Sequence, residues 1–196
     1  KIQIHGLRAL EMQGIQVLDG EEVMERTRSI KGEQEINAMR CAIHSCEMGM
    51  HEMRKFSVPG VTENNIWAIL HSENIKRGGE WIETRLLSSG QRTNPWFQEC
   101  GPRVLHENEI LAFDTDLIGC YGICVDISRT WFIGESKNIT QKQKDLYTEA
   151  FLQIKENTSI IEPGINIKDL VFGGRMLPKK YEELRYSCKM HGVGLC

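Results

Sequence analysis

The sequence predicts an α+β fold in which helices surround a central β-hairpin. Segment 111–132 is rich in apolar and β-branched residues and contains Gly119 and Gly122 where the chain is expected to reverse, which is typical of two strands joined by a tight turn. Before and after this segment, apolar residues recur three and four positions apart, which is the period of amphipathic helices. The predicted order is two helices, a strand, the hairpin, two helices and a final strand, which hints at two similar halves.

Residues 1–28 are expected to be the end of one unit and a linker to the next. They combine a short apolar alternation at Ile2 and Ile4, a predicted strand at 14–18 and a charged, helix-like stretch at 21–27. The chain begins without a methionine and stops inside a Gly-rich segment. We therefore expect it to be part of a longer protein.

Two helices are predicted next. Segment 33–56 has apolar residues in a regular helical pattern, and its methionines are interpreted as core residues rather than ligands. Thr62 is a suitable N-cap for a second helix at 63–76, and the glycines that follow Arg77 are expected to end it.

A strand at 81–89 and a loop at 90–102 lead into the hairpin. The loop contains Trp96 and Phe97 side by side, and such aromatics either fill a core or line a pocket. Both alternatives remain open on the sequence.

The segment after the hairpin predicts two more helices and a strand. Thr140 is the expected N-cap of a helix that runs to about Asn157, and a shorter helix is predicted at 167–176. Segment 186–195 is expected to be a strand that enters a Gly-rich turn.

Three aspartates lie in the predicted hairpin. Asp114 and Asp116 share a face because residues two apart on a strand point the same way, and a turn near Cys120 would place Asp126 opposite Asp114. Carboxylates about 4 Å apart repel by about 4 kcal/mol at a dielectric constant of 20, so they either share protons or bind a cation. A divalent metal site is favoured over the alternative, in which Asp126 pairs with Arg129 and the other two cap the turn.

His191 is the candidate nitrogen ligand of this site. It lies in the segment His-Gly-Val-Gly, whose glycines allow backbone to come close to a site. Together with the three aspartates it makes a set of oxygen and nitrogen donors that suits iron, manganese, cobalt or zinc better than magnesium.

Composition excludes several classes of function. A net charge of −3 and the lack of a long basic run argue against nucleic acid or an anionic membrane as partner, and no apolar run is long enough to span a bilayer. The seven cysteines form no CxxC pair, which indicates reduced thiols and a cytoplasmic location.

The spaced motifs resemble those of the creatinase, prolidase and methionine aminopeptidase family of pita-bread metalloenzymes. The similar segments are IKGEQEINAMRCA at the first long helix, FDTDLIGCYGICVDISRT in the hairpin and MHGVG near the end. The resemblance implies that residues 1–28 are the tail of an N-terminal domain with its linker, and that 29–196 form an incomplete catalytic domain of this fold.

The resemblance also implies a dinuclear metal site in the full-length protein. Asp114, Asp116, Asp126 and His191 match the family's aspartate and histidine ligands. Two further glutamate ligands are expected beyond Cys196.

Two departures from the peptidases of the family suggest a different substrate. The peptidases carry Asp-x-Gly where this chain has Asp114-Thr115-Asp116, and they carry a histidine in the upstream loop where this chain has Trp96. Both features resemble one branch of the family, the dimethylsulfoniopropionate lyases. This branch implies cleavage of dimethylsulfoniopropionate to dimethyl sulfide and acrylate, with iron as the expected metal, in a homodimer.

The expected roles follow from the chemistry of that zwitterionic substrate. The metal would bind the carboxylate and stabilise charge on the α-carbon, with Asp126 at the catalytic centre. Trp96, Tyr121 and Tyr186 are candidates for holding the sulfonium cation, and Tyr186 also for orientation or proton transfer. The general base is expected beyond the last residue.

Two alternatives remain. An Xaa-Pro dipeptidase or aminopeptidase with a divergent loop would hydrolyse proline peptides and release no gas. A pita-bread binding protein without metal is the third possibility, although such a protein has no need of buried carboxylates.

Overall fold

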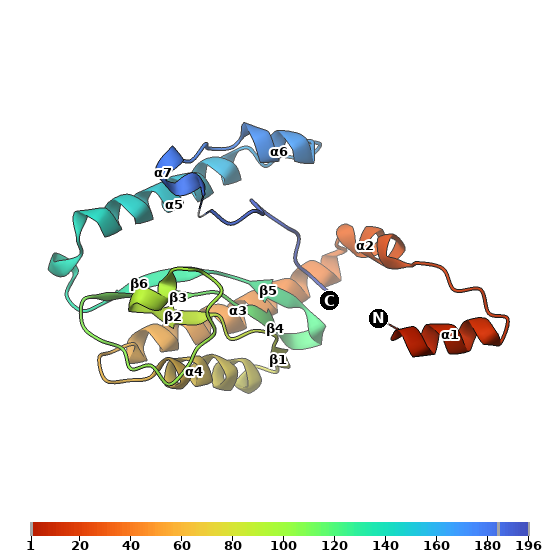
Figure 1. Ribbon diagram of the computed structural model, residues 1–196, viewed down its shortest axis with the longest axis horizontal. Coiled ribbons are helices and arrows are strands. Elements are labelled where there is room, and N and C mark those ends of the chain that lie inside the picture. The colour runs from red at the N-terminus through yellow and green to blue at the C-terminus, as the bar shows by residue number, and fades with distance from the viewer. Residues whose placement is uncertain (1, 184, 196) are drawn as a thin grey trace.

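The computed structural model describes residues 2–183 and 185–195, so Lys1 and Cys196, the outer limits of the two predicted domains, lie outside the described residues. Two three-stranded antiparallel sheets form the centre of the molecule, and helices lie on both sides of them (Figure 1). This arrangement confirms the predicted α+β class.

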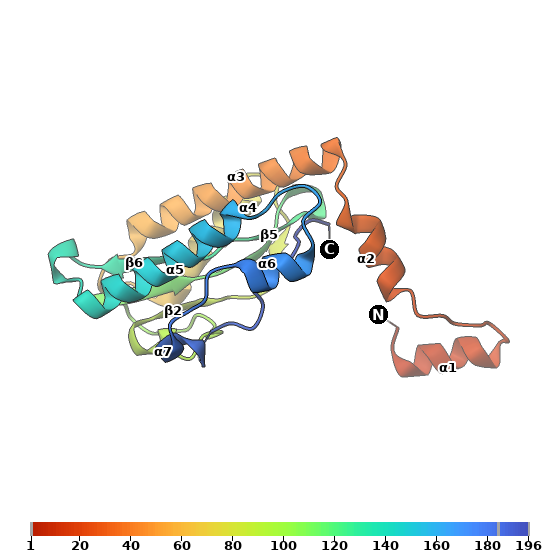
Figure 2. The same cartoon turned by 90° about the horizontal axis from the view of Figure 1, so that it is seen from above.

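The first two helices lie apart from the body. Helix α1 (Ile4–Met12) and helix α2 (Glu21–Ser29) project to one side in both views, and neither has a buried residue (Figure 1 and Figure 2). The predicted helical stretch at 21–27 is confirmed. The predicted strand at 14–18 is wrong, because Gly14 ends α1 with a positive φ of 76° and the residues after it pair with no strand of the described chain.

Helices α3 (Glu33–Phe56) and α4 (Glu63–Lys76) have the predicted bounds and pack against each other. The Glu35 carboxylate accepts a hydrogen bond from the Gly32 N–H at 2.8 Å, and the Thr62 hydroxyl accepts one from the Asn65 N–H at 3.2 Å. Both bonds satisfy N–H groups that a helix start leaves without a partner. The two helices bury the following core residues: Ala42, Cys46, Met50, Met53, Ile66, Trp67 and Leu70.

The predicted hairpin is confirmed, but its strands are divided between two sheets. The outer part pairs β3 (Glu109–Phe113) with β6 (Arg129–Ile133), and β2 (Leu87–Ser89) lies on the other side of β3. The inner part pairs β4 (Asp116–Ile118) with β5 (Cys124–Asp126), and β1 (Trp81–Ile82) lies beside β4.

The predicted strand at 81–89 is divided in the same way. Its two ends form β1 and β2 in different sheets, and the chain bends between them, where the Leu87 N–H donates to the Arg85 carbonyl at 2.8 Å. The bend brings Thr84 beside Asp116.

The inner hairpin turns tightly against α3. A short 3-10 turn, η2 (Cys120–Gly122), reverses the chain, with Tyr121 at a φ of 64°. A Cβ added at Gly119 would lie 2.5 Å from the Ala42 Cβ and 2.9 Å from its Cα, so only glycine permits this approach.

Three helices lie on the other side of the sheets: α5 (Gln141–Ser159), α6 (Ile167–Gly173) and α7 (Lys179–Glu182). Thr140 caps α5 as predicted, and its hydroxyl accepts from the Gln143 N–H at 3.3 Å. No helix in the described part of the chain has the length and apolar character needed to cross a bilayer.

Segment 186–195 is not the predicted strand. It pairs with the rest of the chain through an isolated β-bridge between Leu195 and Ile123. Beside this bridge, the Cys124 N–H donates to the Gly194 carbonyl at 2.8 Å. These contacts at its far end bring the segment back to the inner hairpin.

Candidate active site

Asp116 and Asp126 face each other across the inner hairpin. The register pairs Asp116 with Asp126, because the turn centres on Tyr121 rather than Cys120. The prediction that Asp126 lies opposite Asp114 is therefore wrong, since its partner in the register is Asp116, two residues further along. Asp114 follows the end of β3 and shares a side-chain hydrogen bond with Asp126.

Asp114 and Asp116 point to the same side, as predicted. Thr115 between them is fully buried and belongs to the core side of the chain. Two hydroxyls hold the carboxylates: Ser128 Oγ donates to Asp114 Oδ1 at 2.6 Å, and Thr84 Oγ1 donates to Asp116 Oδ2 at 2.7 Å.

The sequence reasoning missed both hydroxyls. Ser128 lies two residues after Asp126, and this spacing could have placed it on the same face. Thr84 carries no such signal, since only the bend between β1 and β2 brings it to the site.

His191 reaches the carboxylates from the other side. Its Nε2 lies 2.9 Å from Asp126 Oδ2, and its Nδ1 lies 3.0 Å from the Gly192 carbonyl oxygen. Arg129 does not take this place, since its guanidinium donates to the Ser128 carbonyl. The structure thus brings Asp114, Asp116, Asp126 and His191 together in one pocket.

Burial and neighbouring charge alter the acidity of this cluster. Burial, followed by the charge and hydrogen bond of Asp114 and the charge of Asp116, raises the pKa of Asp126 to about 6, although His191 opposes the shift. The hydrogen bond with the Gly192 carbonyl and the charge of Asp126 raise the pKa of His191, against desolvation. The Asp126 carboxylate and the His191 imidazole therefore hold protons more tightly than the isolated groups.

The carboxylate oxygens and the imidazole nitrogen of this cluster are donor types that suit a transition-metal ion. A ligating histidine commonly donates one ring N–H to a backbone carbonyl and directs the other nitrogen at the metal. In His191, Nδ1 contacts the Gly192 carbonyl and Nε2 points toward Asp126, so the ring has this arrangement. A cation would compete with the protons of this cluster, because carboxylate and imidazole must be deprotonated to act as ligands. Among residues 2–183 and 185–195, no group of three or more His, Cys, Asp or Glu side chains has the arrangement needed to hold a metal ion.

Aromatic side chains enclose the same pocket, which has a volume of about 940 Å³. Trp96 and Phe97 come from the loop after β2, and Tyr186 from the last segment of the chain. The ring centroids of Trp96 and Phe97 are 6.1 Å apart, and those of Phe97 and Tyr186 are 5.3 Å apart. Of the two alternatives for the loop aromatics, the structure supports pocket lining.

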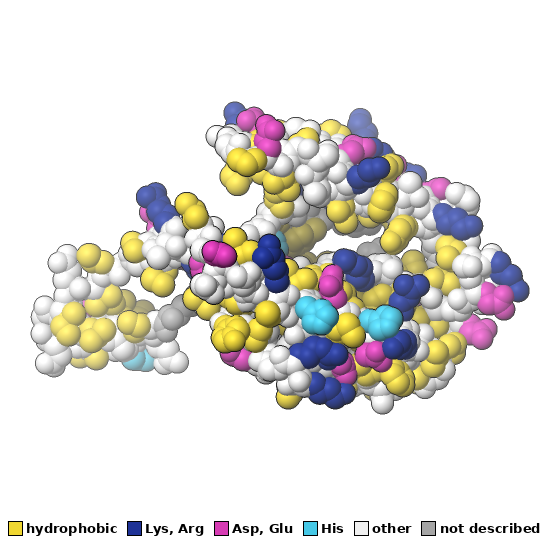
Figure 3. All heavy atoms as spheres, turned by 180° about the vertical axis from the view of Figure 1, so that it is seen from behind, with side chains coloured by type: hydrophobic (Ala, Val, Ile, Leu, Met, Phe, Trp, Pro, Cys, Tyr) yellow, Lys and Arg dark blue, Asp and Glu magenta, His cyan; other side chains and the backbone are white. Residues whose placement is uncertain are grey.

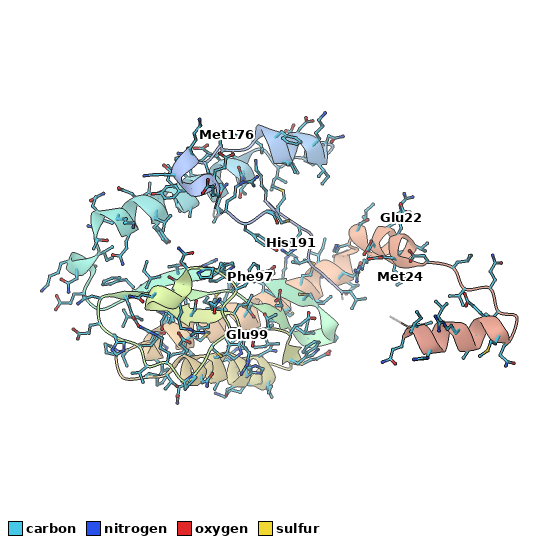
Figure 4. All side chains as sticks on the ribbon, in the orientation of Figure 1. Glu22, Met24, Phe97, Glu99, Met176 and His191 are labelled. Atoms are coloured by element: carbon cyan, nitrogen blue, oxygen red, sulfur yellow. The ribbon has the colours of Figure 1, made fainter. Side chains whose placement is uncertain are left out.

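The pocket lies between the sheets and the helices α5–α7. Figure 3 shows the hollow between these two parts, with hydrophobic side chains along its margins. In Figure 4, Phe97 lies on the sheet side and His191 on the segment that faces it. An adjoining cavity of about 730 Å³ extends under α5, lined by Ala150, Ile154 and Tyr181 among others.

The structure does not bring Tyr121 to this pocket. Its side chain is 76% exposed and lines a separate groove with Cys41 and Leu195. It lies in η2, at the tip of the inner hairpin, and its backbone there is in the left-handed conformation.

Comparison with known proteins gives a family and a fold. The model of metallopeptidase family M24 matches residues 37–196. The chain is 54% identical to the dimethylsulfoniopropionate lyase DddP of Roseobacter denitrificans and 52% identical to that of Roseovarius nubinhibens. Each match covers the whole chain and 45% of the relative, so the chain spans about half the length of these proteins.

The similarity to peptidases is weaker in sequence but extends to the fold. The chain is 26% identical to the putative dipeptidase YkvY of Bacillus subtilis, over 93% of the chain and 50% of the relative. The prolidase of Pyrococcus furiosus superposes with a TM-score of 0.79 at 17% identity, over 87% of this chain and 50% of that one. The predicted pita-bread fold is thereby confirmed, in the partial form that half of such a protein provides.

Proposed function

The chain belongs to metallopeptidase family M24, and we propose that within this family it forms part of a lyase that cleaves dimethylsulfoniopropionate to dimethyl sulfide and acrylate. The observation that carries the proposal is the identity of 52–54% to two dimethylsulfoniopropionate lyases along the entire chain, against 26% to a putative dipeptidase. The pocket supports it, since it combines metal-ligand chemistry with aromatic walls.

The aromatic walls suit the cationic end of this substrate. A sulfonium group is attracted to the face of an aromatic ring within about 6 Å of its centroid. We infer that Trp96 and Tyr186 hold this group, with Phe97 completing the wall between them. Tyr121 has no part in this proposal because it lines another groove.

We propose that Asp114, Asp116, Asp126 and His191 hold a divalent metal, with further ligands from the remainder of the full-length protein. Iron is the metal we propose first, and manganese, zinc and cobalt are the alternatives. When bound, such an ion supplies Lewis-acid stabilisation for the substrate carboxylate and for charge that develops next to it.

The elimination breaks one C–H and one C–S bond and forms the C=C bond of acrylate. The α-proton goes to a base that we expect in the remainder of the full-length protein, and the electron pair of the C–S bond leaves with neutral dimethyl sulfide. Asp126 is proposed to act at the catalytic centre, and the Tyr186 hydroxyl to orient the substrate or transfer a proton. Tyr186 is suited to this because it lines the pocket on the same segment as His191.

The wider setting is also a proposal. We infer a tail of an N-terminal domain with its linker at 1–28 and a catalytic unit at 29–196, in a cytoplasmic homodimer. Two observations support this division: α1 and α2 lie apart from the body of the molecule, and the family match begins at residue 37.

The test uses the full-length protein with its native metal. Incubation with dimethylsulfoniopropionate should release dimethyl sulfide into the headspace, and Asp126→Ala and His191→Ala should each abolish the gas and lower the metal content. Asp145→Ala and His51→Ala, which change exposed residues on α5 and α3, are the matched controls and should keep activity.

A proline dipeptide is assayed in parallel to separate the alternatives. Free amino acid without dimethyl sulfide would establish the peptidase and reject the lyase. Neither product, together with a metal-free protein, would leave the binding protein as the function.

A further inference from the structure

One buried carboxylate joins the two ends of the loop that carries the aromatic wall. Glu63 is the first residue of α4, and its side chain is fully buried. The loop of residues 90–100 leaves the sheet after Ser89 and returns at Gly101, with Trp96 and Phe97 near its tip.

Each carboxylate oxygen of Glu63 binds a different end of the loop. Oε1 accepts from the Ser89 N–H at 2.8 Å and from the Ser89 hydroxyl at 2.7 Å. Oε2 accepts from the Gly101 N–H at 3.1 Å and from the Arg92 guanidinium. The backbone adds to this, since the Glu63 N–H donates to the Arg103 carbonyl at 2.9 Å.

Arg92 connects the carboxylate to the interior of the loop. Besides its ion pair with Glu63, its guanidinium donates to the Glu99 carbonyl at 2.6 Å. A buried carboxylate is strongly unfavourable without a partner charge and hydrogen bonds, and here most of these come from the loop or its ends. The closed loop is therefore the conformation in which Glu63 is satisfied.

We propose that Glu63 is a positioning residue of the pocket, which fixes the loop 90–100 so that Trp96 and Phe97 face Tyr186. Through these rings it sets the affinity for the cationic end of the substrate, a role that rests on the lyase function proposed above. The hydrogen bonds of its carboxylate go to Ser89, Arg92 and Gly101, not to the proposed metal ligands, which predicts little effect on how the carboxylate end of the substrate is bound.

The experiment compares the two ends of the substrate in the full-length, metal-loaded protein. Dimethylsulfoniopropionate occupies both ends, whereas acrylate, as a product inhibitor, has a carboxylate and no cation. In Glu63→Gln we expect the KM for dimethylsulfoniopropionate to rise about tenfold, the size of a desolvated cation–π contact, with kcat and the inhibition constant of acrylate little changed. Glu99→Gln is the control, because that carboxylate lies on the same loop but is half exposed and pairs with Arg85.

A double-mutant cycle tests whether Glu63 acts through the aromatic wall. In a Trp96→Ala background, Glu63→Gln should raise KM no further, since, of the two rings that Glu63 positions, the one that holds the sulfonium group is gone. Arg92→Lys keeps the charge but loses the fork that spans Glu63 and Glu99, and it should give an intermediate rise in KM. If Glu63→Gln does not fold, the KM of Arg92→Lys tests in its place whether this network positions the aromatic wall.

Two results would overturn the proposal and make Glu63 a general structural residue. One is that the effects of Glu63→Gln and Trp96→Ala on KM are additive, and the other is that Glu63→Gln weakens acrylate binding as much as it raises KM.

If the wild type releases no dimethyl sulfide, the lyase function fails, and chymotrypsin then tests the positioning role alone. Cleavage after Trp96 and Phe97, mapped by mass spectrometry, should be faster in Glu63→Gln than in wild type and Glu99→Gln. Equal rates would contradict the role.

Discussion

At the scale of single residues, the site depends on hydroxyls that hold its aspartates. Thr84 and Ser128 each donate one short hydrogen bond, to Asp116 and Asp114 respectively. Such a bond fixes the direction of the other carboxylate oxygen, which is the one available to a metal. Groups of this kind commonly change metal affinity by about 10–100-fold.

Thr84→Val and Ser128→Ala should therefore weaken metal binding about tenfold each in the full-length protein, with the fold retained. The measurement is a competition titration against a chelator, with metal content and circular dichroism recorded for each variant. Ser159→Ala removes an exposed hydroxyl that donates to the Glu156 carbonyl and is the matched control. Affinities equal to wild type would mean that the carboxylates need no such support.

The four proposed ligands could be read from the sequence because strand alternation and a Gly-rich context mark them. Glu63 could not, since a glutamate at the start of a helix usually faces water, and nothing local signals that Ser89 and Gly101 will surround it. Aromatic character alone predicts Tyr121 as a pocket residue, but it lies in the turn itself, where its ring lines another groove.

At the scale of elements, local rules located the helices better than the strands. Thr62 and Thr140 are caps whose effect is confined to one turn, so α4 and α5 begin where predicted. The strands at 81–89 and 111–132 depend on partners far along the chain, and no local pattern reveals where a strand passes from one sheet to another. The missing strand at 186–195 has the same cause.

The contact between α3 and the inner hairpin gives a prediction at this scale. Gly119→Ala should destabilise the full-length protein by about 1–3 kcal/mol, because the added Cβ meets Ala42 and the hairpin must shift. The shift also displaces Asp116 and Asp126, so metal content should fall together with the melting temperature.

Gly20→Ala is the control, since nothing lies within 4 Å of a Cβ added there. Thermal melting and metal analysis of both variants check the prediction. A Gly119→Ala protein as stable as wild type would show that α3 can move away without cost.

At the scale of the whole molecule, α5 exposes an apolar face. Tyr147 is 58% exposed, Phe151 54% and Ile154 68%. The chain spans only 45% of the length of its lyase relatives, and we infer that other parts of the full-length protein cover this face.

The 196-residue chain produced alone should therefore bind severalfold more of the dye ANS per mole than the full-length protein. Phe151→Lys combined with Ile154→Lys should reduce the signal of the chain alone, whereas Met12→Lys, on α1, should leave most of it. Equal fluorescence of the chain and the full-length protein would mean that the face stays open in both.

The attachment of both loop ends to Glu63 also bears on how new specificities arise. Lengthening a flexible loop is inexpensive, about 0.6 kcal/mol for each doubling, provided that its ends stay in place. Glu63 on α4, and not the residues at the tip of the loop, holds Ser89 and Gly101 in place. The residues at the tip can therefore be substituted without loss of the loop's position. Evolution, or an engineer, can then replace the aromatic residues and redirect the pocket to another cation while the hairpin that carries the aspartates stays unaltered.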